Sequence, residues 1–248
     1  MPPAFTLDAV TVDLGPARLL GPVTLNLEAG VTTALLGASG AGKSTLLRLL
    51  NGLLRPSQGA VLFGGAKLEL ARLPEQRRQM GYMVQGGGLF PHLTAGENIA
   101  LVARWLGWSE ARIAARQEAL LGLGRLPAEA LARYPGQLSG GQAQRVSLLR
   151  ALMLDPEVLL LDEPLGALDP ITRAELQEDL RETFARLRKT VVLVTHDLGE
   201  AAFLARRLVL LAGGLVVQEG ALADLRDRPA TPFVSQFLRA QRPPPELS

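Results

Sequence analysis

The sequence predicts an α/β fold in which helices flank a parallel sheet, with a β-rich N-terminal portion and an inserted helical lobe. Up to residue 63, short segments rich in Val, Leu and Thr are separated by Gly and Pro, as is typical of strands and turns. From 94 to 131 apolar residues recur with a helical period. After residue 158, apolar strand-like segments alternate with helix-like ones, which is the order expected of a parallel sheet covered on both faces.

The individual elements can be placed along the chain. The predicted strands of the N-terminal portion are residues 5–13, 23–27, 31–36 and 60–63. A glycine-rich turn at 37–45 leads into a helix predicted at 44–53, and a strand-like segment occupies 80–84. The helical lobe repeats its apolar faces at Ile99, Val102, Ala103, Leu106, Ile113, Leu120 and Leu121. After a helix-like run at 144–154, strands are predicted at 158–161, 191–195, 208–211 and 215–218, and helices at 171–188 and 198–206.

The bulk composition excludes several classes of protein. The chain has 248 residues, 48% of them apolar, so it can bury a large core and is not disordered over most of its length. Its 26 Lys and Arg and 24 Asp and Glu are spread along the sequence, which argues against a nucleic-acid partner. It has no cysteine, so disulfides, thiolate metal sites and cysteine nucleophiles are excluded.

The sequence has no recognisable targeting or membrane segment. The N-terminus, Met-Pro-Pro-Ala-Phe-Thr, lacks the basic and apolar regions of a signal peptide, so we expect the chain to remain in the cytoplasm. The longest apolar stretch, 208–217, is too short to span a bilayer and is interrupted by Gly213 and Gly214. Any membrane role is therefore expected to run through a partner protein.

A phosphate-binding loop is predicted where Gly-Ala-Ser-Gly-Ala-Gly-Lys-Ser-Thr follows a strand and opens a helix. In this pattern backbone N–H groups wrap the β- and γ-phosphates, Lys43 brings a positive charge to them, and the Ser44 hydroxyl ligates Mg²⁺. Thr45 can reach the α-phosphate. We therefore expect the chain to bind ATP or GTP through Gly37, Ala38, Ser39, Gly40, Ala41, Gly42, Lys43, Ser44 and Thr45.

The apolar strand at 158–161 ends in two carboxylates, Asp162 and Glu163. Burying two carboxylates at the end of a strand is costly unless a cation balances their charge or they take part in a reaction. Asp162 is placed to hold Mg²⁺ through a water molecule, and Glu163 is placed to polarise an attacking water as a general base. Hydrolysis of the nucleotide is the predicted reaction. Taken alone, the two acids could instead be solvated at the start of a loop.

A second anion-binding turn is predicted at Ser139, Gly140, Gly141 and Gln142, just ahead of the helix-like run. A hydroxyl, glycine N–H groups and a helix N-terminus together can hold phosphate. One chain therefore carries two half-sites for phosphate, and the sequence pattern alone does not explain why it needs both.

Three further residues are candidates for the site. Gln85 follows a strand-like segment and precedes three glycines, whose backbone freedom would let its side-chain amide swing toward Mg²⁺ and the water. His196 follows the predicted strand 191–195 and could contact the γ-phosphate, although alone it would more often be a capping or packing residue. Asp169, followed by Pro170, is typical of a helix N-cap, and that role alone would explain it.

In order and spacing, these motifs resemble the full motif set of ATP-binding-cassette (ABC) ATPases over nearly the whole chain. The resemblance rests on residues 37–45, Gln85, 138–142, 158–164, 165–169 and His196. It implies a P-loop NTPase core with a mixed or parallel sheet, an N-terminal antiparallel β subdomain and an inserted helical subdomain at about 90–155. These parts make up residues 1–240, and a flexible Pro-rich tail follows at 241–248.

The resemblance also gives the second anion-binding turn a role. It implies that the turn closes over ATP held by a second subunit, so that a head-to-tail homodimer forms two complete sites. Ser139 and Gly141 would then touch γ-phosphate across the interface, Asp169 would cross that interface, and hydrolysis would release the dimer.

Two stretches narrow the resemblance to importers. Residues 88–94, Gly-Leu-Phe-Pro-His-Leu-Thr, look like the segment by which importer ATPases meet a cytoplasmic helix of a transmembrane permease. Residues 98–109 and 166–173 are similar to the osmoprotectant branch, which imports glycine betaine, choline and related quaternary amines. The resemblance implies ATP and Mg²⁺ as cofactors, permease subunits and, indirectly, an extracytoplasmic solute-binding protein as partners, and a location on the cytoplasmic face of the cell membrane.

Two alternatives stay open: an importer of another small solute, and a soluble cassette ATPase that acts on nucleic acid or ribosomes. The sequence also departs from the family pattern. Leu14 stands where family members often stack an aromatic residue on adenine, which predicts weaker adenine selectivity. The chain given ends at Ser248 without the paired regulatory domains of many osmoprotectant ATPases, so we expect no sensing of ionic strength through them.

Overall fold

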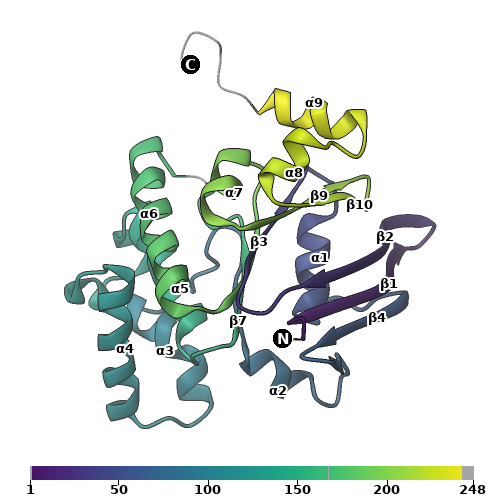
Figure 1. The fold of residues 1–248 in the computed structure, drawn as a ribbon. Helices are drawn as coiled ribbons and strands as arrows, with labels where there is room; N and C mark the ends of the chain where they lie inside the picture. The colour runs from purple at the N-terminus through teal and green to yellow at the C-terminus, as the bar shows by residue number, and fades with distance from the viewer. Residues whose placement is uncertain (1, 167, 242–248) are drawn as a thin grey trace. The chain divides into compact units, whose positions relative to one another are not determined.

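The computed structural model describes residues 2–166 and 168–241. The chain divides into two compact units, called here unit 1 (Met1–Glu69 and Val192–Ser248) and unit 2 (Leu70–Val191). Figure 1 labels many of the helices and strands of both units. The predicted tail falls outside the described residues from 242 onward. Within the part of the chain that the structure describes, no helix combines the length and the apolar character needed to span a lipid bilayer.

An antiparallel sheet forms the N-terminal part of unit 1, as predicted. It contains β1 (Phe5–Leu14), β2 (Ala17–Leu27), β4 (Gln58–Phe63) and β5 (Ala66–Lys67) in the order β2-β1-β4-β5. β2 begins before the predicted start at residue 23 because the strand continues through Gly21 and Pro22, which the sequence pattern marks as a break. Gly21 has a φ of 94°, and an added Cβ would lie 2.1 Å from the carbonyl oxygen of Val10.

A mixed sheet in unit 1 carries the phosphate-binding loop. β9 (Arg207–Ala212) pairs in parallel with β3 (Thr32–Leu36) and antiparallel with β10 (Leu215–Gly220). Buried strands of this kind are apolar on both faces, as β3 and β9 are. Unit 1 also contains the helices α1 (Lys43–Leu50), α7 (Leu198–Leu204), α8 (Leu222–Asp227) and α9 (Pro232–Ala240). The helix predicted at 44–53 therefore ends at Leu50, and the sequence pattern did not indicate α8 or α9.

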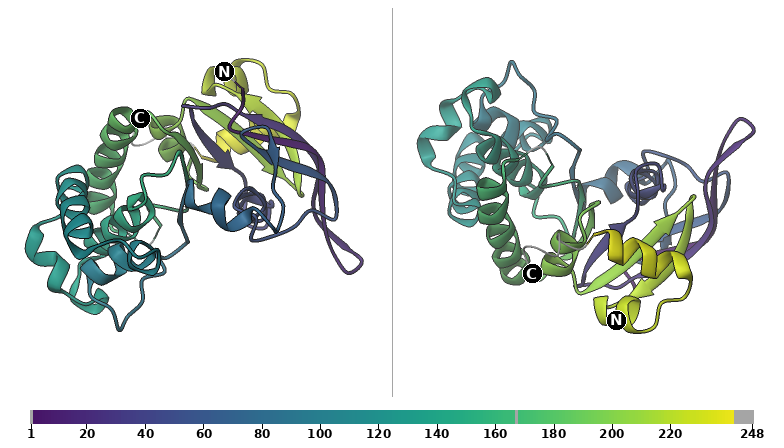
Figure 2. Two further views of the ribbon diagram at one scale, coloured as in Figure 1. Left: turned by 90° about the horizontal axis from the view of Figure 1, so that it is seen from below. Right: turned by 90° about the horizontal axis from the view of Figure 1, so that it is seen from above.

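Unit 2 combines a parallel strand pair with the helical lobe. β6 (Met80–Met83) follows α2 (Leu73–Arg78) and pairs with β7 (Val158–Asp162). The lobe contains α3 (Ala95–Trp105), α4 (Glu110–Gly124), the short 3-10 helices η1 (Ala128–Ala132) and η2 (Pro135–Gln137), and α5 (Gly140–Leu152). α3 contacts α4 and α5, and the three helices gather together in Figure 2. After β7 come α6 (Pro170–Leu187) and β8 (Thr190–Val194), which crosses the boundary between the units.

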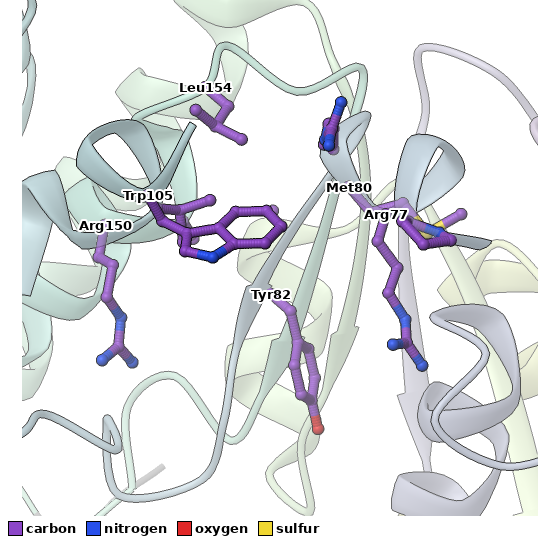
Figure 3. Close-up of a pocket in the computed structure, with 11 residues that line it drawn as sticks. Arg77, Met80, Tyr82, Trp105, Arg150 and Leu154 are labelled. Atoms are coloured by element: carbon purple, nitrogen blue, oxygen red, sulfur yellow. The ribbon is translucent and has the colours of Figure 1, made fainter. Parts of the chain in front are cut away.

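The core of the helical lobe follows the predicted period in part: of the seven predicted apolar positions, four are buried, two (Leu106 and Leu121) are half-buried and one is exposed. Ile99, Ala103, Ile113 and Leu120 are buried, as expected for the inner face of amphipathic helices. Val102, which the same period places on an apolar face, is 39% exposed and lines the pocket that Figure 3 shows. An apolar side chain that the lobe leaves exposed is thus available to something other than the core.

Candidate functional site

The phosphate-binding loop of unit 1 lies between β3 and α1 and depends on its glycines. The φ angle is 151° at Gly37, 77° at Gly40 and 100° at Gly42, values that residues with a Cβ rarely adopt. At Gly37 an added Cβ would also lie 2.3 Å from the carbonyl oxygen of Leu211. α1 begins at Lys43 with no side-chain cap, so its first N–H groups can serve a phosphate.

Lys43 holds its ammonium group against this loop. Its Nζ donates to the carbonyl oxygens of Gly37 (2.7 Å) and Ala38 (2.9 Å), and the residue is 6% exposed. A cation held there would offset the charge of phosphates bound by this loop. Ser44 and Thr45 follow in the first turn of α1, where both are half-buried.

His196 is the other predicted site residue in unit 1, and it is exposed. The residue before it, Thr195, donates its backbone N–H to the carbonyl oxygen of Leu35 (3.2 Å) and its hydroxyl to Glu200 (2.8 Å). The residue after it, Asp197, donates its N–H to the Thr195 hydroxyl (3.1 Å) and caps α7. The backbone on both sides of His196 is therefore fixed, and it is tied to β3, the strand that leads into the phosphate-binding loop.

The two acids at the end of β7 differ in their surroundings. Asp162 is the last residue of the strand and is 3% exposed. A carboxylate buried to this degree needs a cation or hydrogen-bond donors beside it. Glu163 follows with a φ of 49°, a left-handed conformation that is uncommon for a residue with a side chain. Strained backbone of this kind often occurs at functional sites.

Gln85 meets Glu163 in unit 2. The Gln85 Nε2 donates to the Glu163 Oε2 at 2.9 Å and so joins residues 78 positions apart in the sequence. The motifs place both residues near the nucleotide but do not predict this contact. One oxygen of the candidate base is therefore engaged by an amide, and a water molecule would have to share the carboxylate with it.

Two side chains of α5 hold the loop that follows Gln85. The Ser147 Oγ and the Arg150 Nη2 both donate to the carbonyl oxygen of Gly87, at 2.8 and 2.7 Å, and the Arg150 Nη1 donates to that of Gly88 at 2.8 Å. Sequence reasoning missed Ser147 and Arg150, because within a helix-like run nothing distinguishes them from ordinary helical residues.

The second anion-binding turn is a self-capped helix N-terminus. The Ser139 Oγ accepts from the Gln142 N–H (3.2 Å), and the Gln142 Oε1 accepts from the Ser139 N–H (3.0 Å), which together form a capping box at the start of α5. The N–H groups of Gly140 and Gly141 lie in the first turn, where an anion can bind. Gly141 has no room for a side chain, since an added Cβ would lie 2.7 Å from the Thr172 Cγ2.

Asp169 caps α6, as its position before Pro170 predicts. Its Oδ1 accepts the N–H groups of Ile171 (3.1 Å) and Thr172 (3.0 Å). The hydrogen bond from the Thr172 side chain, followed by these backbone bonds, lowers the pKa of the Asp169 carboxyl below its ordinary value. The preceding Leu168 packs on the start of α5, because a Cβ at Gly140 would lie 3.1 Å from it.

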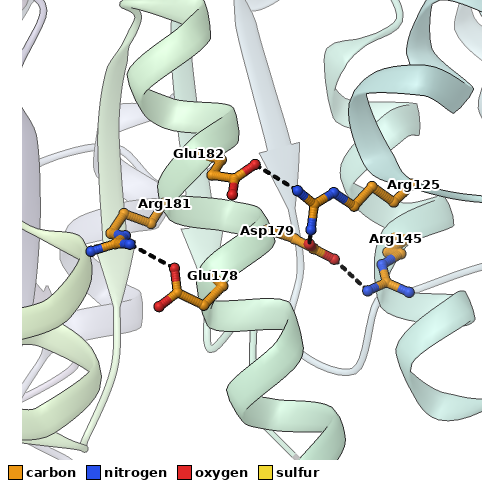
Figure 4. A network of polar contacts seen from close by, with 6 residues as sticks. All are labelled: Arg125, Arg145, Glu178, Asp179, Arg181 and Glu182. Atoms are coloured by element: carbon orange, nitrogen blue, oxygen red, sulfur yellow. Dashed lines mark hydrogen bonds and ion pairs between the residues drawn. The ribbon is translucent and has the colours of Figure 1, made fainter.

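An ion-pair network fastens α6 to the helical lobe (Figure 4). Asp179 on α6 is 8% exposed and accepts from Arg125 Nη1 at 2.7 Å and from Arg145 Nη2. Arg125 Nη2 also pairs with Glu182 at 2.7 Å. A buried carboxylate held by two arginines fixes the geometry of the elements that carry them, since its charge stays compensated only while an arginine remains beside it. The helix that begins at the serine-glycine turn and the helix capped by Asp169 are thus joined.

The segment that resembles an importer's permease contact is held in place from α3. Asn98 is fully buried, accepts the Phe90 N–H (2.8 Å) and donates to the carbonyl oxygens of Phe90, Leu93 and Thr94 at 3.1, 3.0 and 3.0 Å. Phe90 is 43% exposed, and His92, whose ring contacts that of Phe90, is exposed as well. The segment presents an aromatic surface on a rigid support.

The predicted site residues fall into two groups. Unit 1 holds the phosphate-binding loop and His196, and unit 2 holds Gln85, Asp162, Glu163 and the serine-glycine turn. Among the described residues there is no cluster of three or more His, Cys, Asp or Glu side chains suited to a metal ion. A hydroxyl from Ser44, an amide oxygen from Gln85 and the Asp162 carboxylate are nevertheless the hard oxygen ligands that suit Mg²⁺ beside nucleotide phosphates.

Comparison with known proteins identifies a common family. The family profile described as "ABC transporter" matches residues 20–166. The "Glycine betaine uptake system ATP-binding protein YehX" of Escherichia coli is 46% identical over 223 residues, which are 90% of this chain and 72% of that protein. The "Sulfate/thiosulfate import ATP-binding protein CysA" of Bordetella parapertussis is 47% identical over 229 residues, which are 90% of this chain and 64% of that protein.

A solved structure gives the same result. A dimeric ATP-binding cassette in a post-hydrolysis state with ADP and Pi superposes with a TM-score of 0.78 at 34% identity, covering 88% of this chain and 98% of that one. Several curated relatives are longer than the present sequence. The chain spans 57 to 60% of the length of the choline and carnitine transport ATP-binding proteins of Bacillus subtilis and Listeria monocytogenes.

Proposed function

The chain belongs to the ABC transporter ATPase family, and from this premise we propose that it hydrolyses ATP, as a head-to-tail homodimer, to power uptake of quaternary-amine osmoprotectants through a membrane permease. The observation that carries the proposal is the presence in one chain of two glycine-rich helix N-termini, α1 and α5, together with the Gln85–Glu163 pair. One helix end holds a nucleotide, and the other supplies donors to a nucleotide held elsewhere.

The phosphate-binding loop supplies the nucleotide site. The first-turn N–H groups of α1 and the Lys43 ammonium bind the phosphates, and Thr45 reaches the α-phosphate. Ser44, Gln85 and Asp162 would hold Mg²⁺, directly or through water, and the bound ion would offset charge on the β- and γ-phosphates.

Hydrolysis needs a water molecule aligned with the γ-phosphate and a base to polarise it. Glu163 is the base, and its carboxylate accepts a hydrogen bond from Gln85. Gln85 orients the same water molecule. His196 contacts the γ-phosphate from the turn after β8. Positioning and electrostatics dominate phosphoryl transfer, so the fixed backbone around His196 and the loop bonds after Gln85 support this assignment.

The second subunit completes the site. The N-terminus of α5, which includes Ser139, Gly140, Gly141 and Gln142, contacts the γ-phosphate of the opposite ATP. Asp169 lies at the subunit interface. The contacts between α5 and α6 support this arrangement, because they hold the turn and the Asp169 loop close to each other. The dimeric cassette with ADP and Pi is a precedent for such an assembly.

The permease contact is assigned to residues 88–94. Asn98 holds this segment from beneath and leaves Phe90 and His92 exposed, which suits a rigid docking surface for a cytoplasmic helix. The ATPase would therefore sit at the cytoplasmic face of the membrane, with a solute-binding protein acting on the far side of the permease.

The assignment of quaternary amines as cargo follows the osmoprotectant relatives. Sulfate is a second candidate cargo, because a sulfate import relative is equally similar to this chain. The betaine uptake relative and the sulfate import relative match this chain at 46 and 47% identity. Residues 98–109 and 166–173 favour the osmoprotectant branch, whereas identity alone does not separate the two classes. Uptake of labelled glycine betaine and of labelled sulfate into vesicles containing the chain and its permease decides between them.

Substitution of the base tests the catalytic assignment. Glu163→Gln removes the proton acceptor but keeps the side-chain shape, so ATP binding should persist while turnover falls by about a hundredfold or more. ATP-loaded protein should then accumulate as a dimer, detected by size-exclusion chromatography with light scattering. Glu118→Gln, at an exposed position on α4, is the matched control and should keep full turnover. A Glu163→Gln variant that stays monomeric in saturating ATP with permease present would argue against the composite site.

A further inference from the structure

The first turn of α5, which carries the serine-glycine turn, packs against the start of α6. An added Cβ at Gly141 would lie 2.7 Å from the Thr172 Cγ2, and one at Gly140 would lie 3.1 Å from the Leu168 Cδ2. These contacts fix where the end of α5 lies. They do not fix the direction of the helix, because two rods that touch at one end can still pivot about that contact.

A second point of contact between the two helices lies at Asp179. This residue is about two helical turns beyond Thr172 on α6, and it accepts a hydrogen bond from the Arg145 Nη2 in the second turn of α5. The Asp179 side chain is 8% exposed and that of Arg145 is 20% exposed, so salt and water screen the pair weakly. Contacts at two separated points give α5 one direction relative to α6.

Arg125 ties the end of a third helix to the same carboxylate. It directly follows α4 with a φ of 47°, a left-handed conformation in which glycine is the usual residue. A glycine would bring no side chain, whereas the Arg125 guanidinium pairs with Asp179 and with Glu182, each at 2.7 Å (Figure 4). Because the Arg125 side chain is 57% exposed, we expect its ion pairs to contribute less than the pair with Arg145.

The direction of α5 matters because the free N–H groups of its first turn point along the helix axis. The capping box of Ser139 and Gln142 holds the turn together, but it moves with the helix and so does not aim it. Hydrogen bonds weaken steeply as they depart from linearity. A tilt of α5 would therefore weaken several of the donors that the turn offers to a phosphate.

We propose that Asp179 is a positioning residue for ATP hydrolysis, which sets the direction of α5 through Arg145 and Arg125 and so aims the serine-glycine turn at ATP on the opposite subunit. Asp179 acts on the reaction through the helix alone. The inference rests on the proposed head-to-tail dimer. Because the aimed donors serve the opposite subunit, the phosphate-binding loop of the same chain should keep its affinity for ATP.

Steady-state kinetics and calorimetry on the full chain test this role. Asp179→Asn keeps the side-chain shape but removes the charge that holds two arginines, so kcat should fall about tenfold while the Kd for ATP changes less than about twofold. Glu178→Gln is the matched control and should keep kcat, because Glu178 pairs at 2.7 Å with Arg181 of the same helix (Figure 4). Equal kcat values in the two variants, or a tenfold rise in Kd for Asp179→Asn, would overturn the inference.

The two arginine partners should differ in their effects. Arg145→Gln removes the more buried partner and should lower kcat about as much as Asp179→Asn, whereas Arg125→Gln should lower it about twofold. The losses of Arg145→Gln and Asp179→Asn should not add in the double variant, because each removes the same contact. Arg145→Lys keeps the charge and should recover part of the activity. Fully additive losses would contradict a role of this pair.

A general loss of stability is tested at the other end of α5. Arg116 on α4 donates to the carbonyl oxygens of Leu152 (2.8 Å) and Met153 (3.3 Å), where α5 ends. Arg116→Gln therefore loosens the same helix without touching its contacts with α6. Like Asp179→Asn, it should lower Tm by a few degrees, but it should keep kcat. If kcat follows Tm across these variants, the network is a structural support and the inference fails.

Dimer formation provides a readout that does not depend on turnover. In a Glu163→Gln background with saturating ATP, Asp179→Asn should raise the protein concentration at half dimerisation about tenfold, measured by light scattering, because a tilted turn binds the opposite ATP less well. An unchanged concentration would overturn the inference. The proposed function fails separately, if Glu163→Gln alone retains turnover. Loss of turnover in Glu163→Gln with none in Asp179→Asn removes only the role of Asp179.

Discussion

Two helix N-termini of this chain suit phosphate, and they differ in what each supplies. α1 begins without a side-chain cap and has Lys43 as its first residue, held by carbonyl oxygens of its own loop. α5 begins after Ser139, which shares a capping box with Gln142, and residues 139–142 include no cation. The first end is open and cationic, so it can bind a nucleotide alone. The second is satisfied by its own side chains, which suits its proposed role of adding donors to a phosphate that another site holds.

Removing the cation of the first end should have the largest effect on binding. Lys43→Ala deletes the buried ammonium that is proposed to bind the phosphates, and charge-assisted bonds are worth about 3 kcal/mol, so ATP affinity should fall by about a hundredfold or more. Isothermal titration calorimetry measures the change. Lys67→Ala, in the short strand β5 of the same unit, removes the same charge and should leave affinity intact. Equal affinities in the two variants would refute the cationic role.

Removing the cap of the second end should separate stability from turnover. Ser139→Ala loses a helix cap worth about 1 kcal/mol, and the same holds for Ser109→Ala, whose hydroxyl accepts the Arg112 N–H at the start of α4. Both variants should therefore melt a few degrees lower.

ATP affinity should stay unchanged in both variants. Only Ser139→Ala should lose turnover, by about tenfold, which is no more than the loss of one hydrogen-bond donor to the transition state causes. Melting curves and ATPase assays on the pair decide the matter. If Ser109→Ala loses as much turnover as Ser139→Ala, the second end is a structural cap and nothing more.

The two helix N-termini also show how much of the fold and of the candidate site can be predicted from the sequence. Both loops were predictable, because their glycines, lysine and serine occupy adjacent positions and local backbone demands fix their identity. The β-rich N-terminal portion was predictable from its segments rich in Val, Leu and Thr, and the resemblance to the family implied that this portion is antiparallel. The start of β2 was not, because Gly21 and Pro22 are typical of turns, and only the close approach of Val10 explains a glycine inside that strand.

Contacts between distant residues lie beyond what the sequence pattern predicts. The Gln85–Glu163 bond joins two loops through the packing of β6 against β7. Arg150 looks like any arginine on a helix until the chain folds and places it beside Gly87 and Gly88. Periodicity predicts which face of a helix is buried, but the partner of a polar side chain depends on tertiary structure.

The smallest predicted effect concerns the adenine end of the first site. Leu14 ends β1, opposite Ala17 at the tip of the hairpin, and is 69% exposed. The carboxylate of the neighbouring Asp13 pairs with the Arg18 Nε at 2.9 Å. The Arg18 guanidinium is therefore held within the hairpin. An aliphatic side chain stacks more weakly on the adenine ring than an aromatic side chain does. Leu14→Tyr should strengthen ATP binding by about 1 kcal/mol, or roughly fivefold in Kd, if the residue lies where adenine stacks.

The control for this prediction is another exposed leucine of unit 1. Leu53 follows the far end of α1 from the phosphate-binding loop and is 56% exposed, so Leu53→Tyr adds the same ring without a base to stack on. Competition binding with ATP and GTP should show a gain for Leu14→Tyr alone. Because Lys43 and the first turn of α1 are the groups proposed to hold the phosphates, the gain should add to their contribution and survive in a Ser139→Ala background. An unchanged Kd for Leu14→Tyr would place the base elsewhere, and the weak selectivity expected from Leu14 would then have no basis.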